Sequence, residues 1–123
     1  MTEILVVDDY IVQQRVLRQV LSSVGYQVIV ASDGTEALEY LAQSPVSLVI
    51  LDIALPDLDG IEVLLRIRAD AALANLPVVM LTASGSDDVK IAARRAGATA
   101  FLSKPASSHE VIRMVQSLIG EPL

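Results

Sequence analysis

The sequence predicts a doubly wound α/β domain, with a five-stranded parallel sheet in the flavodoxin-like order 2-1-3-4-5 and five helices on both faces. Short aliphatic runs alternate with segments whose apolar residues recur every three or four positions, the pattern of strands alternating with amphipathic helices. The aliphatic run at residues 48–51 is unbroken and bounded by turn residues, which is typical of a strand buried on both faces of a parallel sheet. We expect residues 1–123 to form one domain, because the chain is too short for two.

The composition restricts the core and the partners. Apolar residues make up 53% of the chain and aromatic residues only 3%, so the core must be aliphatic. The absence of cysteine excludes disulfides and thiolate metal sites and fits a reducing cytoplasm. A net charge of −6 argues against nucleic acid or an anionic membrane as a direct partner. With neither an apolar run of ~18 residues nor a basic leader, we expect a cytoplasmic domain.

The first half of the chain supplies three strands and two helices. Residues 4–7 and 26–31 predict the first two strands, and 48–51 the third. Gly25 suits the C-terminus of the first helix, and Pro45 ends the second, which opens after Ser32 and Asp33. The apolar face of the first helix consists of Ile11, Val12, Val16, Leu17, Val20, Leu21 and Val24.

The second half continues the alternation. Residues 61–68 predict the third helix, 78–81 the fourth strand and 100–102 the fifth, while 71–75 show no clear pattern. Residues 84–86 (Ser-Gly-Ser) predict a loop before the fourth helix. Ser86 or Asp87 is predicted to cap the fourth helix, which runs to Ala96, and Ser107 with Glu110 to cap the fifth. The inner side of the third helix is predicted to consist of Ile61, Leu64, Leu65 and Ile67.

Polar side chains follow the carboxyl ends of four predicted strands. Asp8 and Asp9 follow the first strand, Asp52 the third, Thr82 the fourth and Lys104 the fifth. In an open α/β sheet these ends flank the crevice at the switch point, so we expect the side chains to converge. Clustered carboxylates repel unless a cation such as Mg²⁺ compensates. The same groups would suit a phosphoryl group, which a carboxylate can accept as an acyl phosphate.

These residues resemble the receiver domain of two-component response regulators, of the chemotaxis-regulator-like kind. The resemblance covers essentially the whole chain and rests on motifs in the family's order and spacing: Asp8-Asp9, Asp52 within LDIALPDLDG (residues 51–60), Thr82-Ala83, Phe101, and Lys104-Pro105. It implies that Asp52 accepts a phosphoryl group from a histidine kinase or histidine phosphotransfer protein. It also implies a phosphorylation-dependent switch rather than an enzyme.

The resemblance implies a role for each matching residue. Asp9 and Asp52 would bind Mg²⁺ through their carboxylates, Ala54 through its backbone carbonyl, and Asp8 mainly through water. Lys104 would pair with the phosphoryl group.

The remaining matching residues would carry the switch. Thr82 would move to bond the phosphoryl group, and Phe101 would turn inward. A cis peptide bond would precede Pro105. The face formed by the fourth helix, fifth strand and fifth helix would then change for an unidentified downstream protein or output domain. Ala54 and Ser84 are shorter than the side chains often found at their positions in the family.

Two other classes of function also place an aspartate or a ligand at a strand end, but each predicts a feature that this sequence lacks. A phosphatase or phosphotransferase of the haloacid dehalogenase type predicts a second acid two residues after the nucleophile, where Ala54 stands. A nucleotide- or flavin-binding module predicts a glycine-rich loop after the first strand, where the sequence has Asp8-Asp9-Tyr10. A degenerate receiver used only as a scaffold is disfavoured, because the whole set of site residues is present.

Taken singly, several of these residues have simpler explanations. Asp9 alone would most often cap a helix. Asp57 and Asp59 are typical turn residues. The sole histidine, His109, is predicted to be a surface residue, and Arg94 with Arg95 to form a solvated face.

Overall fold

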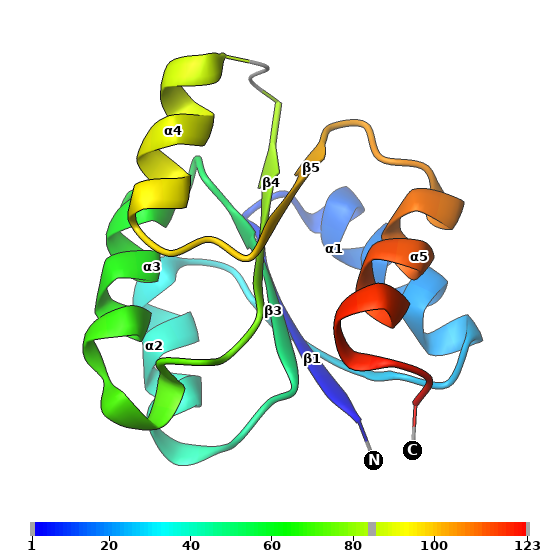
Figure 1. Cartoon of the computed structure of the whole chain (residues 1–123). Helices are drawn as coiled ribbons and strands as arrows, with labels where there is room; N and C mark the ends of the chain where they lie inside the picture. Colours follow the sequence, from blue (N-terminus) through cyan, green and yellow to red (C-terminus); the bar gives the residue numbers. More distant parts are fainter. Residues whose placement is uncertain (1, 84–85, 123) are drawn as a thin grey trace.

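The computed structural model describes residues 2–83 and 86–122. Within them the chain forms a five-stranded sheet, five α-helices and one short 3₁₀ helix (Figure 1). No helix in this part of the chain is both long and apolar enough to cross a bilayer. The elements are β1 (Glu3–Val7), α1 (Ile11–Ser23), β2 (Gln27–Ala31), α2 (Gly34–Gln43), β3 (Leu48–Asp52), α3 (Gly60–Ala69), η1 (Ala71–Leu73), β4 (Val78–Thr82), α4 (Asp87–Arg95), β5 (Ala100–Ser103) and α5 (Ser108–Ile119).

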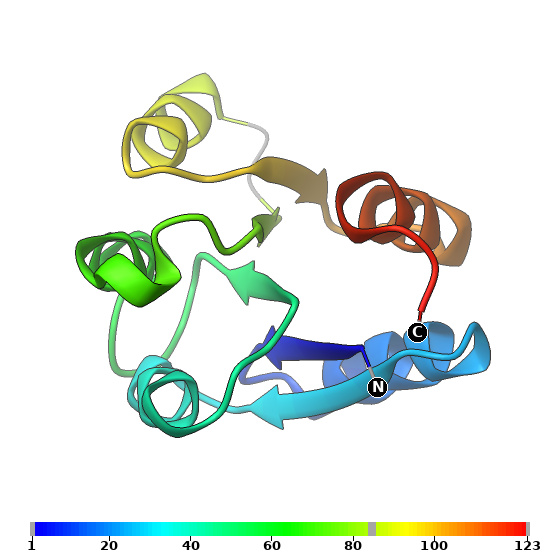
Figure 2. The same cartoon turned by 60° about the horizontal axis from the view of Figure 1, so that its bottom comes forward.

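The sheet confirms the predicted fold class. Its strands are all parallel and follow the order β2-β1-β3-β4-β5. Helices α1 and α5 cover one face, and α2, α3 and α4 cover the other (Figures 1 and 2). Because both faces are covered, every residue of β3 and of β4 is buried, which explains their unbroken apolar runs.

The core has two parts, one on each face of the sheet. Successive side chains of a strand point to opposite faces. Leu5 and Leu51 therefore pack under α2, α3 and α4, while Ile4 and Ile50 pack under α1 and α5. Both parts are almost entirely aliphatic, as the composition predicts.

The predicted apolar face of α1 is only partly buried. Leu17 and Leu21 reach the core, whereas Ile11, Val12 and Val16 are each about half exposed. At about 3.6 residues per turn, these three lie a quarter of a turn or more away from the line through Leu17 and Leu21. The seven apolar residues are therefore spread over an arc wider than the sheet covers.

In α3 the inner position assigned to Leu65 was wrong. Its side chain is 47% exposed, and Val63 is buried instead, together with Leu64 and Ile67. At about 100° per residue, Val63, Ile67 and Leu64 lie within an arc of about 100° on the helix, and Leu65 lies about another 100° beyond Leu64, on the solvent side.

Side-chain oxygens cap the starts of three helices, although Asp59, at α3, was predicted only as a turn residue. Ser107 and Glu110 form a capping box at α5, which confirms that prediction. The carboxylate of Asp33 accepts a hydrogen bond at the start of α2, and that of Asp59 does so at the start of α3.

Two connections were less well specified by the sequence. Residues 71–75, which had no clear pattern, contain η1, where the Asp70 carboxylate accepts a hydrogen bond from Ala72 N at 2.9 Å. Ser86 is the N-cap residue of α4, which ends at Arg95, one residue earlier than predicted. Ser84 and Gly85, predicted to lie in the preceding loop, are outside the described residues.

Candidate functional site

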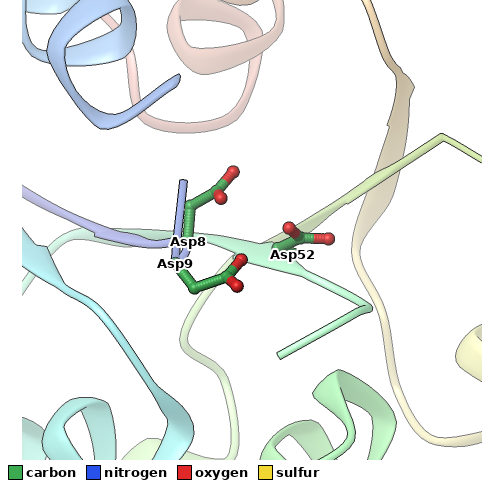
Figure 3. Close-up of side chains that lie close together, drawn as sticks. All are labelled: Asp8, Asp9 and Asp52. Carbon is green, nitrogen blue, oxygen red and sulfur yellow. The ribbon is translucent and has the colours of Figure 1, made fainter. Parts of the chain in front are cut away.

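Three carboxylates meet at the carboxyl ends of β1 and β3. The two strands pair with Val7 opposite Leu51, so the next residues, Asp8 and Asp52, lie side by side (Figure 3). Carboxylate oxygens of Asp8, Asp9 and Asp52 come within 4.8 Å of one another. Asp8 is 1% and Asp52 5% exposed, whereas Asp9 is exposed. We call these three residues the acidic cluster.

Lys104 brings a positive charge to the acidic cluster. Its Nζ lies 2.8 Å from Asp52 Oδ2 and 3.3 Å from Asp8 Oδ2. Its backbone N donates to the Thr82 carbonyl at 2.8 Å, which ties the residue after β5 to the end of β4. Burial lowers the pKa of the Lys104 ammonium, but the hydrogen bond and charge of Asp52, with the charge of Asp8, outweigh it and raise the pKa above its ordinary value. Lys104 therefore stays charged at neutral pH. The Lys104–Pro105 peptide bond is cis.

The buried charge of Asp8 is only partly compensated. Its Oδ1 accepts a hydrogen bond from Tyr10 N at 2.9 Å. Its buried Oδ2 has the ionic contact with Lys104 but accepts no hydrogen bond within the described part of the chain. Burial raises the pKa of the Asp8 carboxyl, and the nearby charge of Asp52 adds to this, against the opposing effects of Tyr10 N–H and Lys104. An under-satisfied buried carboxylate beside two others is an environment that a cation would stabilise.

A cleft of about 390 Å³ opens beside the acidic cluster. Within it, Ala54 N donates to Asp52 Oδ1 at 3.0 Å, so both oxygens of Asp52 have a donor, the other being Lys104 Nζ. Thr82, at the end of β4, is 3% exposed. The cleft thus combines carboxylates, a hydroxyl and an ammonium, and its lining residues are Asp9, Asp52, Ile53, Ala54, Thr82, Ala83, Val89 and Lys104.

Phe101 lies outside this cleft. It lies on β5, half-buried, and lines a separate groove of about 510 Å³ between β5 and α5. The guanidinium carbon of Arg94, on α4, lies 5.6 Å from the centre of its ring. His109 is exposed in the first turn of α5, as expected of a surface residue.

Two aspartates do not follow the simpler explanations, which were helix capping for Asp9 and turn formation for Asp57. Asp9 does not cap α1, because the N-cap residue is Tyr10, which makes no side-chain cap bond. Asp57 does not act only within its own turn, because its carboxylate accepts hydrogen bonds from Gly34 and Thr35 at the start of α2. The sequence holds no local signal for this contact, since the two segments meet only in the folded chain.

Comparison with known proteins assigns the family. Residues 4–116 match the response regulator receiver domain. The chain is 39% identical over 116 residues to the response regulator MprA of Mycobacterium sp. (strain KMS), in an alignment that covers 94% of this chain and 50% of MprA. The chain spans about half the length of the curated relatives that it matches.

Solved structures of receiver domains share the fold. The chemotaxis protein CheY4 of Vibrio cholerae superimposes with a TM-score of 0.92 at 30% identity, over 96% of this chain and 98% of CheY4. The receiver domain of the sensor histidine kinase PA1611 from Pseudomonas aeruginosa PAO1 gives 0.90 at 32% identity over 98% of both chains, with a magnesium ion coordinated in its active site cleft. Since the family model matches residues 4–116 and solved receiver domains share the fold, the chain belongs to the response regulator receiver domain family.

Proposed function

We propose that this receiver domain accepts a phosphoryl group on Asp52 and acts as a switch, not as an enzyme that turns over a substrate. The contact of the Lys104 ammonium with Asp52, beside Asp9 and Thr82, carries the proposal. Family membership supports a histidine kinase or a histidine phosphotransfer protein as the donor. A downstream protein or output domain would receive the signal in the cytoplasm. Residues 1–123 would form a single receiver domain.

The transfer step needs little from the protein besides position and charge. An electron pair on a carboxylate oxygen of Asp52 forms a bond to phosphorus, and the bond from phosphorus to the donor's imidazole nitrogen breaks. The imidazole keeps that electron pair and takes a proton from solvent. Lys104 then contacts a phosphoryl oxygen in place of Asp52 Oδ2, and the Thr82 hydroxyl donates to another, which stabilises the negative charge of the product.

The residues present fit a magnesium ion. Mg²⁺ prefers a few carboxylate or carbonyl ligands and keeps several waters, and the acidic cluster lies beside a cleft of about 390 Å³ that has room for them. Asp9 and Asp52 would hold the ion through their carboxylates, Ala54 through its backbone carbonyl, and Asp8 mainly through water. The under-satisfied Oδ2 of Asp8 supports this assignment. When bound, the ion would neutralise charge on the phosphoryl oxygens.

Phosphorylation would act on the face formed by α4, β5 and α5. It adds nearly one further negative charge and three acceptor oxygens at the end of β3. Thr82 on β4 would move toward them, and Phe101 on β5 would turn into the space that Thr82 leaves. The groove that Phe101 lines, between β5 and α5, would change shape for the partner. Shifting a 1:99 equilibrium to 99:1 needs about 5.5 kcal/mol, which a few charge-assisted hydrogen bonds at about 1.5–3 kcal/mol each can supply.

The intact mass of the protein after incubation with acetyl phosphate tests this proposal. The wild type should gain one phosphoryl group only when Mg²⁺ is present, and Asp52→Asn should gain none. Asp59→Asn is the matched control, because it removes an exposed acid from the same loop and should still be phosphorylated. An equal gain in Asp52→Asn would contradict the assignment of the site. No gain in the wild type, from acetyl phosphate or from a phosphorylated donor protein, would contradict the function.

A further inference from the structure

Asp57 lies between β3 and α3, yet its carboxylate is bound to the start of another helix. Its Oδ1 accepts a hydrogen bond from Gly34 N at 2.8 Å, and its Oδ2 accepts from both the backbone N, at 3.0 Å, and the hydroxyl of Thr35. Oδ1 also accepts from Leu58 N at 2.7 Å. The N–H groups of a helix's first turn have no partner within the helix, and a carboxylate there also interacts favourably with the helix dipole.

Helix α2 does not depend on Asp57 for its cap. Asp33 already accepts a hydrogen bond from Glu36 N at 2.8 Å. Two carboxylates thus share one helix start, and only Asp57 comes from a distant segment. The Thr35 hydroxyl, together with the backbone N–H groups of Gly34, Thr35 and Leu58, holds the pKa of Asp57 well below its ordinary value. Asp57 is therefore a charged attachment between the β3–α3 loop (residues 53–59) and α2.

The β3–α3 loop is also closed at its base. Gly60 N donates to the Ile53 carbonyl at 2.7 Å. A Cβ at position 60 would lie 2.3 Å from the Asp52 carbonyl oxygen and 2.6 Å from Ile53 Cα, so the two ends of the loop touch. A Cβ at Gly34 would lie 3.0 Å from Leu58 Cβ, which shows that the start of α2 packs directly on the loop.

Ala54 lies between these two points of attachment. Its N–H is bound to Asp52 Oδ1, and its carbonyl is the proposed backbone ligand of the cation. A backbone carbonyl cannot be reoriented by rotating a side chain, so its position relative to the cation is set by the position of the loop. We propose that Asp57 is a positioning residue for the magnesium site: by fastening the β3–α3 loop to α2, it holds the Ala54 carbonyl where the cation binds. This inference rests on the proposed function.

The turn between β2 and α2 is also attached, through Gln14, to the segment after β1 that carries Asp8 and Asp9. Gln14 Nε2 donates to the backbone carbonyl of Asp8 at 2.5 Å and to the hydroxyl of Ser32 at 3.2 Å. Residues 32–35 therefore contact, directly or through Gln14, both segments that carry the acidic cluster, although they supply no ligand themselves. The same turn thus serves as a common support, as expected of groups that orient metal ligands from behind.

Isothermal titration with Mg²⁺ at neutral pH tests the role of Asp57. We expect Asp57→Ala to weaken Mg²⁺ binding about tenfold, in the range typical for removal of a supporting group. Asp33→Ala is the matched control, because it removes the same charge from the same helix start but leaves the loop attached, and it should bind nearly as tightly as the wild type. Asp57→Asn keeps an acceptor for Gly34 N–H and should lose less than Asp57→Ala. Thermal unfolding in EDTA establishes that each variant is folded.

The outcomes separate this role from others. A folded Asp57→Ala that binds Mg²⁺ as tightly as the wild type would overturn the proposal. Equal losses in Asp57→Ala, Asp57→Asn and Asp33→Ala would also overturn it, because charge alone would explain them. If Asp57→Ala does not fold, Thr35→Val should bind more weakly than Thr35→Ser, which keeps the hydroxyl, and equal affinities of these two would count against it. A wild type that binds no Mg²⁺ would contradict the magnesium site itself, a result distinguishable from all of these.

Discussion

Lys104 Nζ lies 2.8 Å from Asp52 Oδ2, so the ammonium group already contacts the carboxylate oxygen that a cation or a phosphoryl group would approach. We therefore expect Lys104→Met to bind Mg²⁺ more tightly, because the ammonium no longer competes for the acidic cluster or repels the ion. At saturating Mg²⁺, phosphorylation by acetyl phosphate should be slower, because a charge that stabilises the transferring group is missing. Titration calorimetry and the rate of mass gain measure the two effects.

Lys104→Arg provides the comparison, since it keeps the charge but changes its shape. It should bind Mg²⁺ more nearly as the wild type does. Weaker Mg²⁺ binding in Lys104→Met than in the wild type would contradict the competition between the ammonium and the ion.

Asp8→Asn should stabilise the magnesium-free protein at neutral pH. The pKa of Asp8 is raised in the folded state above its ordinary 3.8, so folding favours the protonated form and the charged form costs stability at neutral pH. The advantage of the variant should shrink as the pH falls through the raised pKa toward 3.8, because wild-type Asp8 then becomes neutral as well. Thermal unfolding in EDTA across this pH range measures the effect.

The exposed neighbour Asp9 supplies the control. Asp9→Asn removes the same charge one residue away and should change the melting temperature less. A melting-temperature difference between Asp8→Asn and the wild type that is constant with pH would show that titration of Asp8 is not its cause.

Gly60→Ala should destabilise the fold by roughly 3 kcal/mol or more, within the range for forcing an atom into a packed site with little room to adjust. The atoms that the new methyl group would meet, the Asp52 carbonyl oxygen at 2.3 Å and Ile53 Cα at 2.6 Å, belong to the backbone and cannot rotate away. Urea unfolding of the variant and of the wild type gives the difference in their free energies of unfolding.

Gly120→Ala separates steric clash from backbone strain. Gly120 has a φ of +77° but no atom within 4 Å of an added Cβ, so only the strain of about 1 kcal/mol applies. Equal losses at positions 60 and 120 would refute the clash.

Arg68→Met should destabilise the protein by about 2 kcal/mol, although it keeps most of the alkyl stem. The Arg68 guanidinium donates to the Gly97 carbonyl at 3.0 Å and to the Leu73 carbonyl at 3.1 Å, and the loss leaves these carbonyls without a charged donor. Arg66→Met is the control on the same helix, because its pairing with Glu62 is exposed and is worth less than about 0.5 kcal/mol. Urea unfolding of both variants should give clearly different losses, and equal losses would contradict the role of Arg68.

The sequence predicted most of the fold because the decisive signals are local. Strands and helices follow from the spacing of apolar residues, and a rule on crossover connections restricts the strand order. The capping box at Ser107 and Glu110 is likewise complete within four residues. The acidic cluster could be predicted because residues after neighbouring parallel strands must share an edge.

What the sequence could not predict depends on contacts between distant segments. Nothing near Asp57 indicates that Thr35 will bind it, since the two residues are 22 positions apart and meet only in the folded chain. The spacing of apolar residues in α1 could not show that Ile11 would stay exposed, because the pattern does not say how wide an arc the sheet covers. At Asp9, the general preference of aspartate for helix caps does not apply, because α1 begins at Ile11 and its N-cap residue is Tyr10.

The attachment of Arg68 has a mechanical consequence for α4. The Gly97 carbonyl that Arg68 holds follows the last turn of this helix, near the amino ends of the strands, whereas Val89 in its first turn lines the cleft. A displacement that begins at Thr82 would therefore reach the helix at one end while the other end stays fastened. The helix would turn as a lever about Gly97, so that its first residues, around Asp87, would travel along a longer arc than Arg95.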